Sequence, residues 1–304
     1  MPVFERIAIL GVGLIGASIA RAAREYGAAN TIALYDADPA VRQRARELGL
    51  GEVFDDAVSA VTKAGLVVLA VPVGAMGAAA EACAPGLENG AVVTDVGSVK
   101  GAVVSAVATK ISTHAYFIPG HPIAGTEHSG PDAGFAALFQ NRWHILTPLV
   151  DGREEYPLFV DKLEQFWRAL GANVERMEPD RHDVVLAVTS HLPHLIAFNI
   201  VAMAEDLESV TESEVVKYSA SGFRDFTRIA ASDPTMWRDV FLNNRDAVLE
   251  VLGRFSEDLA ALQRAIRWGE GDTLYDLFDR ARRMRREVIE AGQDTPAPNW
   301  GREN

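Results

Sequence analysis

The fold is decided by RIAILGVGLIG, residues 6–16 of the chain. The apolar run before the glycines predicts a buried β-strand, and the segment after them predicts a helix. Gly11 suits the tight turn, Gly13 lets a ligand approach the backbone, and Gly16 lets the helix pack closely on the strand. The order strand, glycine turn, helix therefore predicts a dinucleotide-binding βα unit, with the phosphates at the helix N-terminus.

The next predicted strand, residues 31–35, ends beside Asp36, which lies 20 residues past Gly16. A carboxylate there can bind the adenine ribose hydroxyls and would repel a 2′-phosphate, so we expect NAD rather than NADP as the cofactor. Arg42 and Arg44 follow on a predicted helix, where we expect them to be solvated. The other expected cofactor contacts lie in the glycine turn and after later strands, namely Leu14, Ile15, Val71, Pro72 and Ser98.

Short apolar runs alternate with helix-like segments through the first half of the chain. The further predicted strands are residues 66–71, 91–95, 116–118, 143–147 and 173–177. This alternation is typical of an α/β fold, a doubly wound, mostly parallel Rossmann-type sheet. From Asp180 onward strand-like runs give way to amphipathic segments at 182–207, 234–267 and 272–291. We therefore expect a dinucleotide-binding domain at residues 1–179 and an all-helical substrate and dimerisation domain at 180–304.

Composition excludes several classes of function. The 304 residues carry a formal net charge of −13, which disfavours nucleic acid and anionic membranes as partners. Cys83 is the single cysteine, so no disulfide framework or thiolate metal cluster can form within one chain. The N-terminus has no signal-peptide pattern, and no window suggests a membrane span. We expect a soluble cytoplasmic protein.

A second informative stretch is GHPIAGTEHSG, residues 120–130. Pro122 restricts the residue before it, so His121 should be held in an extended loop that a ligand can reach. Histidine is the side chain that exchanges a proton most readily near neutral pH. Ser98 and Lys100 follow another predicted strand, and ligands bind at strand carboxyl ends in such sheets.

Taken together, these motifs resemble the prephenate/arogenate dehydrogenase family, also called the cyclohexadienyl dehydrogenases. The resemblance runs from about residue 6 to 290. Its later motifs are more specific than the glycine turn, and they are Ser190-His191-Leu192-Pro193-His194, the run from Gly222 to Ala230, Ser232-Asp233-Pro234 and Met236-Trp237.

The resemblance implies an NAD-dependent oxidative decarboxylation in tyrosine biosynthesis. Prephenate would give 4-hydroxyphenylpyruvate, and arogenate would give tyrosine. His121 matches the catalytic base, Ser98 a hydroxyl that orients it, and Arg228 a substrate-binding arginine. The other residues expected to line the substrate site are His194, Thr126, Glu127, Ser232, Trp237 and Asp225. The spacing of His191 and His194 also suits a metal, but such an oxidation needs none, so we expect no metal.

Two alternatives stay open. A 3-hydroxyacid dehydrogenase would share the layout but needs a catalytic lysine, and Lys217 is the one lysine after Ala172. A dinucleotide-binding regulator without catalysis would need neither His121 nor Arg228. Between the two substrates, the neutral Asn141 slightly favours prephenate, but Glu127 or Asp225 could pair with the ammonium of arogenate, so use of both substrates stays open.

The apolar stripes of the last helices are broad for a domain of this size, and the resemblance also implies a homodimer through them. Tyrosine resembles the substrates, so we expect that, if it inhibits, it competes for the active site.

Overall fold

The structure is a computed structural model that describes residues 1–111, 113–126, 128–211 and 221–290. By its internal contacts the chain divides into two units, Met1–Val248 and Leu249–Asn304. Within the described residues, those after residue 179 form helices and turns. The domain boundary expected near residue 179 rests on that change of secondary structure and remains a prediction.

A parallel sheet of six strands forms the centre of the first unit, in the order β3-β2-β1-β4-β5-β6. This is the strand order of Rossmann-type folds, as predicted. The strands are β1 (Phe4–Leu10), β2 (Ala29–Tyr35), β3 (Glu52–Val53), β4 (Leu66–Leu69), β5 (Val92–Asp95) and β6 (Tyr116–Phe117).

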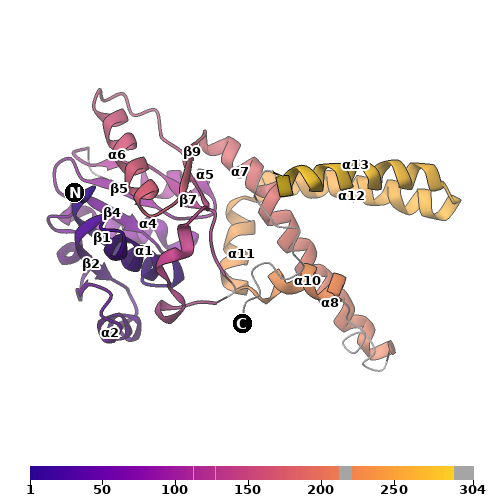
Figure 1. Ribbon diagram of the computed structural model, residues 1–304, viewed down its shortest axis with the longest axis horizontal. Helices are drawn as coiled ribbons and strands as arrows, with labels where there is room; N and C mark the ends of the chain where they lie inside the picture. The colour runs from indigo at the N-terminus through magenta and orange to yellow at the C-terminus, as the bar shows by residue number, and fades with distance from the viewer. Residues whose placement is uncertain (112, 127, 212–220, 291–304) are drawn as a thin grey trace. The chain divides into compact units, whose positions relative to one another are not determined.

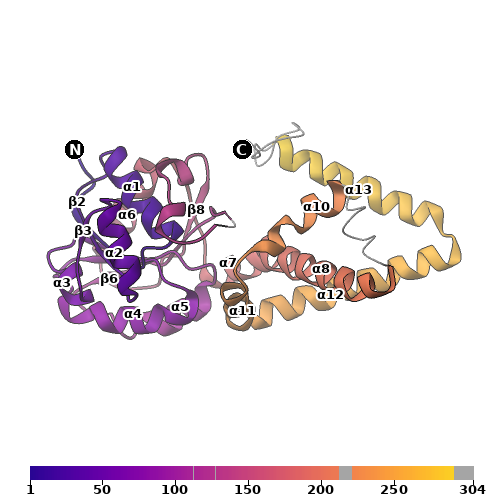
Figure 2. The ribbon, with the colours of Figure 1, turned by 90° about the horizontal axis from the view of Figure 1, so that it is seen from below.

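Helices cover both faces of this sheet because its strands are apolar on both sides. Ile7 and Ile9 of β1 pack with α1 (Leu14–Glu25) and α6 (Tyr156–Ala169) in one core. Ala8 and Leu10 pack on the other face with three more helices. These are α3 (Ala57–Val61), α4 (Met76–Cys83) and α5 (Lys100–Val107) (Figure 1 and Figure 2). The remaining short elements are α2 (Pro39–Glu47), η1 (Val73–Ala75), η2 (Ala84–Gly86), η3 (Pro131–Ala133) and η4 (Ala136–Phe139).

Three further strands form a separate sheet in the order β7-β8-β9, which the sequence did not predict. They are β7 (Gly120–Pro122), β8 (Trp143–Leu146) and β9 (Asn173–Arg176). The expected loop at His121 was therefore wrong, since this residue pairs with Ile145 across an antiparallel ladder. Proline is compatible with an extended strand at a sheet edge, which is where β7 lies.

The helices of residues 179–248 are more broken than the apolar periodicity predicted. α7 (Pro179–Leu186) continues through a π-helical turn (Ala187–His191) into α8 (Leu192–Thr211). The predicted segment 234–267 splits at Asn244 into α11 (Pro234–Asn243) and α12 (Arg245–Trp268). Asp233 caps α11 by accepting a hydrogen bond from the Met236 N–H at 2.8 Å. α10 (Ser221–Thr227) and η6 (Arg228–Ala231) lie between α8 and α11 in the chain.

By length and composition, the helix over Pro179–Asp206 could cross a membrane, which contradicts the expectation that no window would. It also contains His182, Asp183 and His191, which are buried and hydrogen-bonded to other parts of the first unit. In its apolar window 22% of the residues are buried, and the others are partly or fully exposed. An exposed apolar helix of this kind also suits a protein–protein interface.

In the second unit, the chain turns back at Gly269 (φ 68°) after α12 and continues as α13 (Gly271–Glu290) (Figure 2). Within the described residues, α13 has no buried side chain. The large exposed apolar side chains of this unit are Leu249, Leu259, Ile266, Trp268, Tyr275, Phe278 and Met284.

Candidate active site

The glycine turn has the shape that a dinucleotide requires. A Cβ on Gly11 (φ 97°) would lie 2.3 Å from the Ala70 carbonyl oxygen, and one on Gly16 would lie 2.0 Å from the Gly11 oxygen. At Gly13 a Cβ would meet nothing within 4 Å, so this face of the turn is open. Gly13 is also the N-cap of α1 and makes no side-chain capping bond there. The open turn and the helix N-terminus fit a pyrophosphate, and they would hold it through backbone N–H groups.

Asp36 is fixed at the end of β2. Its Oδ2 accepts a hydrogen bond from Val12 N–H at 2.8 Å, and its Oδ1 accepts one from Asp38 N–H at 2.9 Å. Arg42 is not solvated as expected: its side chain is 14% exposed and donates to the carbonyl oxygens of Asp36 and Ala37. The carboxylate is oriented at the position predicted for the ribose hydroxyls.

The other expected cofactor residues lie around the same turn. Leu14 and Ile15 open α1 and are half-buried. Val71 and Pro72 follow β4, and the Val71 side chain lies 3.0 Å from where a Gly11 Cβ would be. The ends of β1 and β4 therefore meet at this turn.

A buried ion pair holds the backbone next to His121. Lys100 and Asp95 are fully buried and paired, and Lys100 Nζ also donates to the Gly120 carbonyl oxygen at 2.5 Å. Asp95 Oδ1 accepts the Gly120 N–H at 3.2 Å, so both polar groups of Gly120 are bound. A Cβ on Gly120 would lie 2.6 Å from His144 Nε2, which explains the glycine. This pairing attaches β7 to the carboxyl end of β5.

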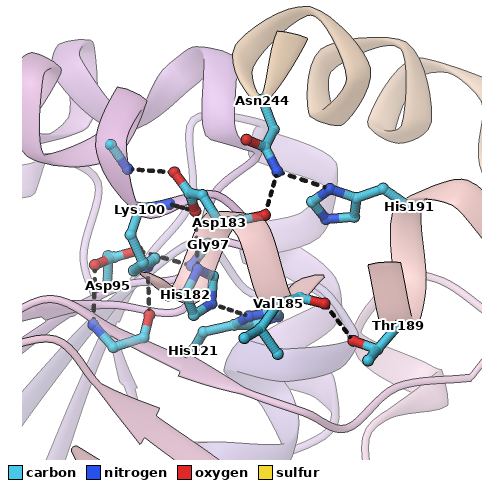
Figure 3. A network of polar contacts seen from close by, with 12 residues as sticks. Asp95, Gly97, Lys100, His121, His182, Asp183, Val185, Thr189, His191 and Asn244 are labelled. Atoms are coloured by element: carbon cyan, nitrogen blue, oxygen red, sulfur yellow. Dashed lines mark hydrogen bonds and ion pairs between the residues drawn. The ribbon is translucent and has the colours of Figure 1, made fainter. Parts of the chain in front are cut away.

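The imidazole of His121 begins a chain of polar contacts that we call the relay: His121, His182 and Asp183 (Figure 3). His121 Nδ1 lies 2.9 Å from His182 Nε2, and His182 Nδ1 lies 2.8 Å from Asp183 Oδ1. His182 and Asp183 come from α7, which packs against α5. The relay therefore joins β7 to the first helix after residue 179.

The imidazole of His121 is neutral near neutral pH, chiefly because it is buried. Burial lowers the pKa of His121 well below its usual value, and the nearby His182 and Lys100 lower it further. Burial also lowers the pKa of His182, although Asp183 opposes this. Burial alone would raise the pKa of Asp183, but hydrogen bonds from His182, Lys100 and Gly101 bring it below its usual value. A neutral imidazole that is linked through a second imidazole to a charged carboxylate can act as a general base.

The predicted substrate residues of the helical segment partly converge. The ring of Trp237 on α11 stacks on His194 at 3.7 Å between centroids and 23° between planes. Burial lowers the pKa of His194, the hydrogen bond with the Ser190 carbonyl oxygen opposes this, and the charge of Arg228 lowers it further. α8 contacts η6, which begins at Arg228. Trp237 is buried at 7% exposure and also packs with Val99, so its role includes the core.

Three other predicted substrate residues make local contacts. Ser232 Oγ donates to the Ile229 carbonyl oxygen at 2.8 Å, which closes the turn after η6. Thr126 is exposed, and its Oγ1 accepts the His128 N–H at 3.2 Å. Asp225 lies 3.9 Å from the guanidinium of Arg224.

Ser98 is half-buried in the loop after β5, and within the described part of the chain its hydroxyl makes no hydrogen bond to His121. Asn141 has a left-handed backbone (φ 58°), a conformation that asparagine favours, so its identity tells little about the substrate. Glu127 and Lys217 lie outside the described residues.

His182, Asp183 and Asn244 were not predicted from the sequence. The adjacent pair at 182–183 opens an amphipathic segment and carries no spacing signal. Asn244 lies at a helix break that periodicity does not show, and its side chain donates to the Asp183 carbonyl oxygen at 2.9 Å. His191 Nδ1 is 3.0 Å from the same amide group. Across the described ranges, no group of three or more metal-binding side chains occurs.

Comparison with known proteins gives concordant results. Residues 19–176 match the family model of the prephenate dehydrogenase nucleotide-binding domain, and residues 178–280 match that of the prephenate dehydrogenase dimerization domain. A cyclohexadienyl dehydrogenase from Zymomonas mobilis is 44% identical over 94% of this chain and 96% of its own.

Two solved structures are similar over 93% of this chain. A prephenate dehydrogenase from A. aeolicus, in complex with hydroxyphenyl propionate and NAD⁺, is 34% identical, with a TM-score of 0.85 over 98% of its chain. An arogenate dehydrogenase from Synechocystis is 27% identical, with a TM-score of 0.78 over its whole chain (100%).

The open glycine turn, the ribose carboxylate and a neutral histidine at the same end of the sheet define an NAD-dependent oxidoreductase. The matches described above extend through both parts of the chain. The chain belongs to the prephenate dehydrogenase family.

Proposed function

We propose that this enzyme oxidises and decarboxylates prephenate, arogenate or both with NAD, in tyrosine biosynthesis. The observation that carries this is the neutral imidazole of His121, fixed on β7 at the carboxyl end of the sheet that bears the glycine turn. Family membership supports the choice of substrates.

Each part of the reaction has a residue suited to it. The glycine turn and Asp36 would hold NAD, which when bound accepts a hydride from the ring carbinol carbon. His121 takes the hydroxyl proton as the C=O bond forms. The ring carboxylate then leaves as carbon dioxide, its bonding electrons make the ring aromatic, and His121 returns the proton to the phenolate oxygen. We expect Arg228, at the start of η6, which contacts the helix that carries His194, to bind a substrate carboxylate.

Steady-state kinetics with prephenate and arogenate, each with NAD and NADP, tests this proposal. We expect NAD reduction with at least one substrate and a lower kcat/KM with NADP, because a ribose 2′-phosphate would face Asp36. 3-Hydroxyisobutyrate serves as the control substrate. Turnover of this control without turnover of either cyclohexadiene would contradict the proposal.

We also propose that the enzyme is a soluble cytoplasmic homodimer formed through the helices after residue 179. The exposed apolar side chains of α12 and α13 and the match to a dimerization domain support this. Light scattering at micromolar concentration should give twice the chain mass of 32.9 kDa. A monomer would contradict the dimer. Tyrosine should raise the KM for the substrate without lowering kcat if it competes for the site.

A further inference from the structure

The hydrogen bonds of the relay determine where its protons lie. The carboxylate of Asp183 accepts the Lys100 N–H on Oδ1 at 2.7 Å and the Gly101 N–H on Oδ2 at 2.8 Å. An ionised carboxylate has no proton to donate. Its contact with His182 Nδ1 can therefore be a hydrogen bond only if Nδ1 carries the proton.

The position of the proton on His182 determines its position on His121. A neutral His182 with its proton on Nδ1 has a lone pair on Nε2. That Nε2 lies 2.9 Å from His121 Nδ1, so His121 must donate from Nδ1. The lone pair of His121 is then on Nε2, the nitrogen that the relay does not use.

We propose that His182 and Asp183 are positioning residues that hold His121 as its Nδ1–H tautomer, which leaves Nε2 ready to accept the substrate proton. This inference rests on the proposed function, in which His121 is the base. An imidazole without such a partner carries its proton mainly on Nε2. That nitrogen then has no lone pair with which to accept the substrate proton. The hydrogen bond to the other ring nitrogen sets the tautomer.

The surroundings of the relay suit this role. His182 is fully buried, and the backbone of Asp183 is held by Asn244, whose side chain donates to its carbonyl oxygen at 2.9 Å. After proton transfer, the imidazolium of His121 can still donate from Nδ1 to His182. The negative charge of Asp183 is then one ring away and stabilises the cation, as carboxylates do in other catalytic relays.

Nitrogen NMR of protein labelled with ¹⁵N-histidine tests the tautomer directly. Signals of the two rings can be assigned by their loss in His121→Asn and His182→Met. We expect the shifts of both neutral rings to show protonated Nδ1 and unprotonated Nε2. A His121 ring with its proton on Nε2 would overturn the proposal. This measurement needs no substrate, so it stands even if the proposed function fails.

A matched pair of variants tests the effect on catalysis. His182→Gln keeps an acceptor near the former Nε2, whereas His182→Met has similar length and no acceptor. We expect His182→Met to lower kcat about 10- to 100-fold with KM within about threefold, and His182→Gln to keep most of the turnover. An equal loss in both variants would refute the role of the acceptor. If His182→Met does not fold, the NMR result on the wild-type protein decides.

Discussion

His121 and His144 lie on neighbouring strands of one sheet, where His144 pairs with Pro122, yet their surroundings differ. His121 is partly exposed and belongs to the relay. His144 is fully buried, and within the described structure neither ring nitrogen has a hydrogen-bond partner. Its ring stacks on Trp167 at 3.7 Å and 16°, and we call these two residues the buried stack.

Burial lowers the pKa of both histidines, so a low pKa alone does not identify a base. The relay adds a fixed tautomer and leaves one ring nitrogen outside its hydrogen bonds, and proton transfer requires both. The buried stack adds flat surface for packing, at the cost of unpaired polar atoms. The difference teaches that hydrogen-bond partners, rather than burial, separate a catalytic from a packing histidine. Changing one region at a time tests this.

The largest effect should come from His121→Asn. The variant should fold and bind, because asparagine keeps a polar group on β7, but it has no nitrogen to accept the hydroxyl proton. We expect kcat to fall roughly 10²- to 10⁴-fold in steady-state assays. The matched control is His144→Phe, which keeps a flat ring against Trp167 and should retain kcat within about threefold. Comparable losses in the two variants would remove the distinction between relay and buried stack.

A second test concerns the buried charge that supports the relay. Lys100→Met leaves the fully buried Asp95 without its cation, which should lower the free energy of unfolding by about 3–5 kcal/mol. The control is Lys110→Met, whose pair with Glu81 is exposed (36% and 71%) and should cost no more than about 1 kcal/mol. Urea unfolding measures both. Similar losses would mean that the buried pair contributes no more than a surface pair.

Much of this architecture follows from the sequence because local signals decide it. The glycine turn, the apolar strands and Asp36 are each specified by a few neighbouring residues, and the six-stranded order agrees with them. The second sheet could not be predicted, since β7 has three residues and pairs with a strand more than 20 positions away.

The relay was also hidden, because it depends on tertiary contacts. His182 and Asp183 lie about 60 residues from His121 in the chain, and their roles follow from a 2.9 Å contact. The family resemblance pointed to His121 and Arg228 but not to what sets the tautomer of the base. A single sequence contains no local pattern for such a contact.

The smallest expected effect is the pH dependence of stability that comes from His144. The folded-state pKa of His144 is lowered by burial, so below about pH 6.5 the unfolded chain binds a proton that the folded protein does not. The wild-type free energy of unfolding must therefore decrease as pH falls through this range, by up to about 1.4 kcal/mol per pH unit from this group. His144→Phe removes the group and its contribution.

Urea unfolding of both proteins at pH 8 and pH 5.5 measures that contribution. The stability of His144→Phe relative to wild type should rise by about 1 kcal/mol on acidification, whatever their difference at pH 8. The pH 8 value is an internal control, because the imidazole is neutral there in both states. If the difference in free energy of unfolding between the two proteins does not change with pH, His144 must gain a partner or a proton in the folded protein. The buried stack would then no longer contrast with the relay.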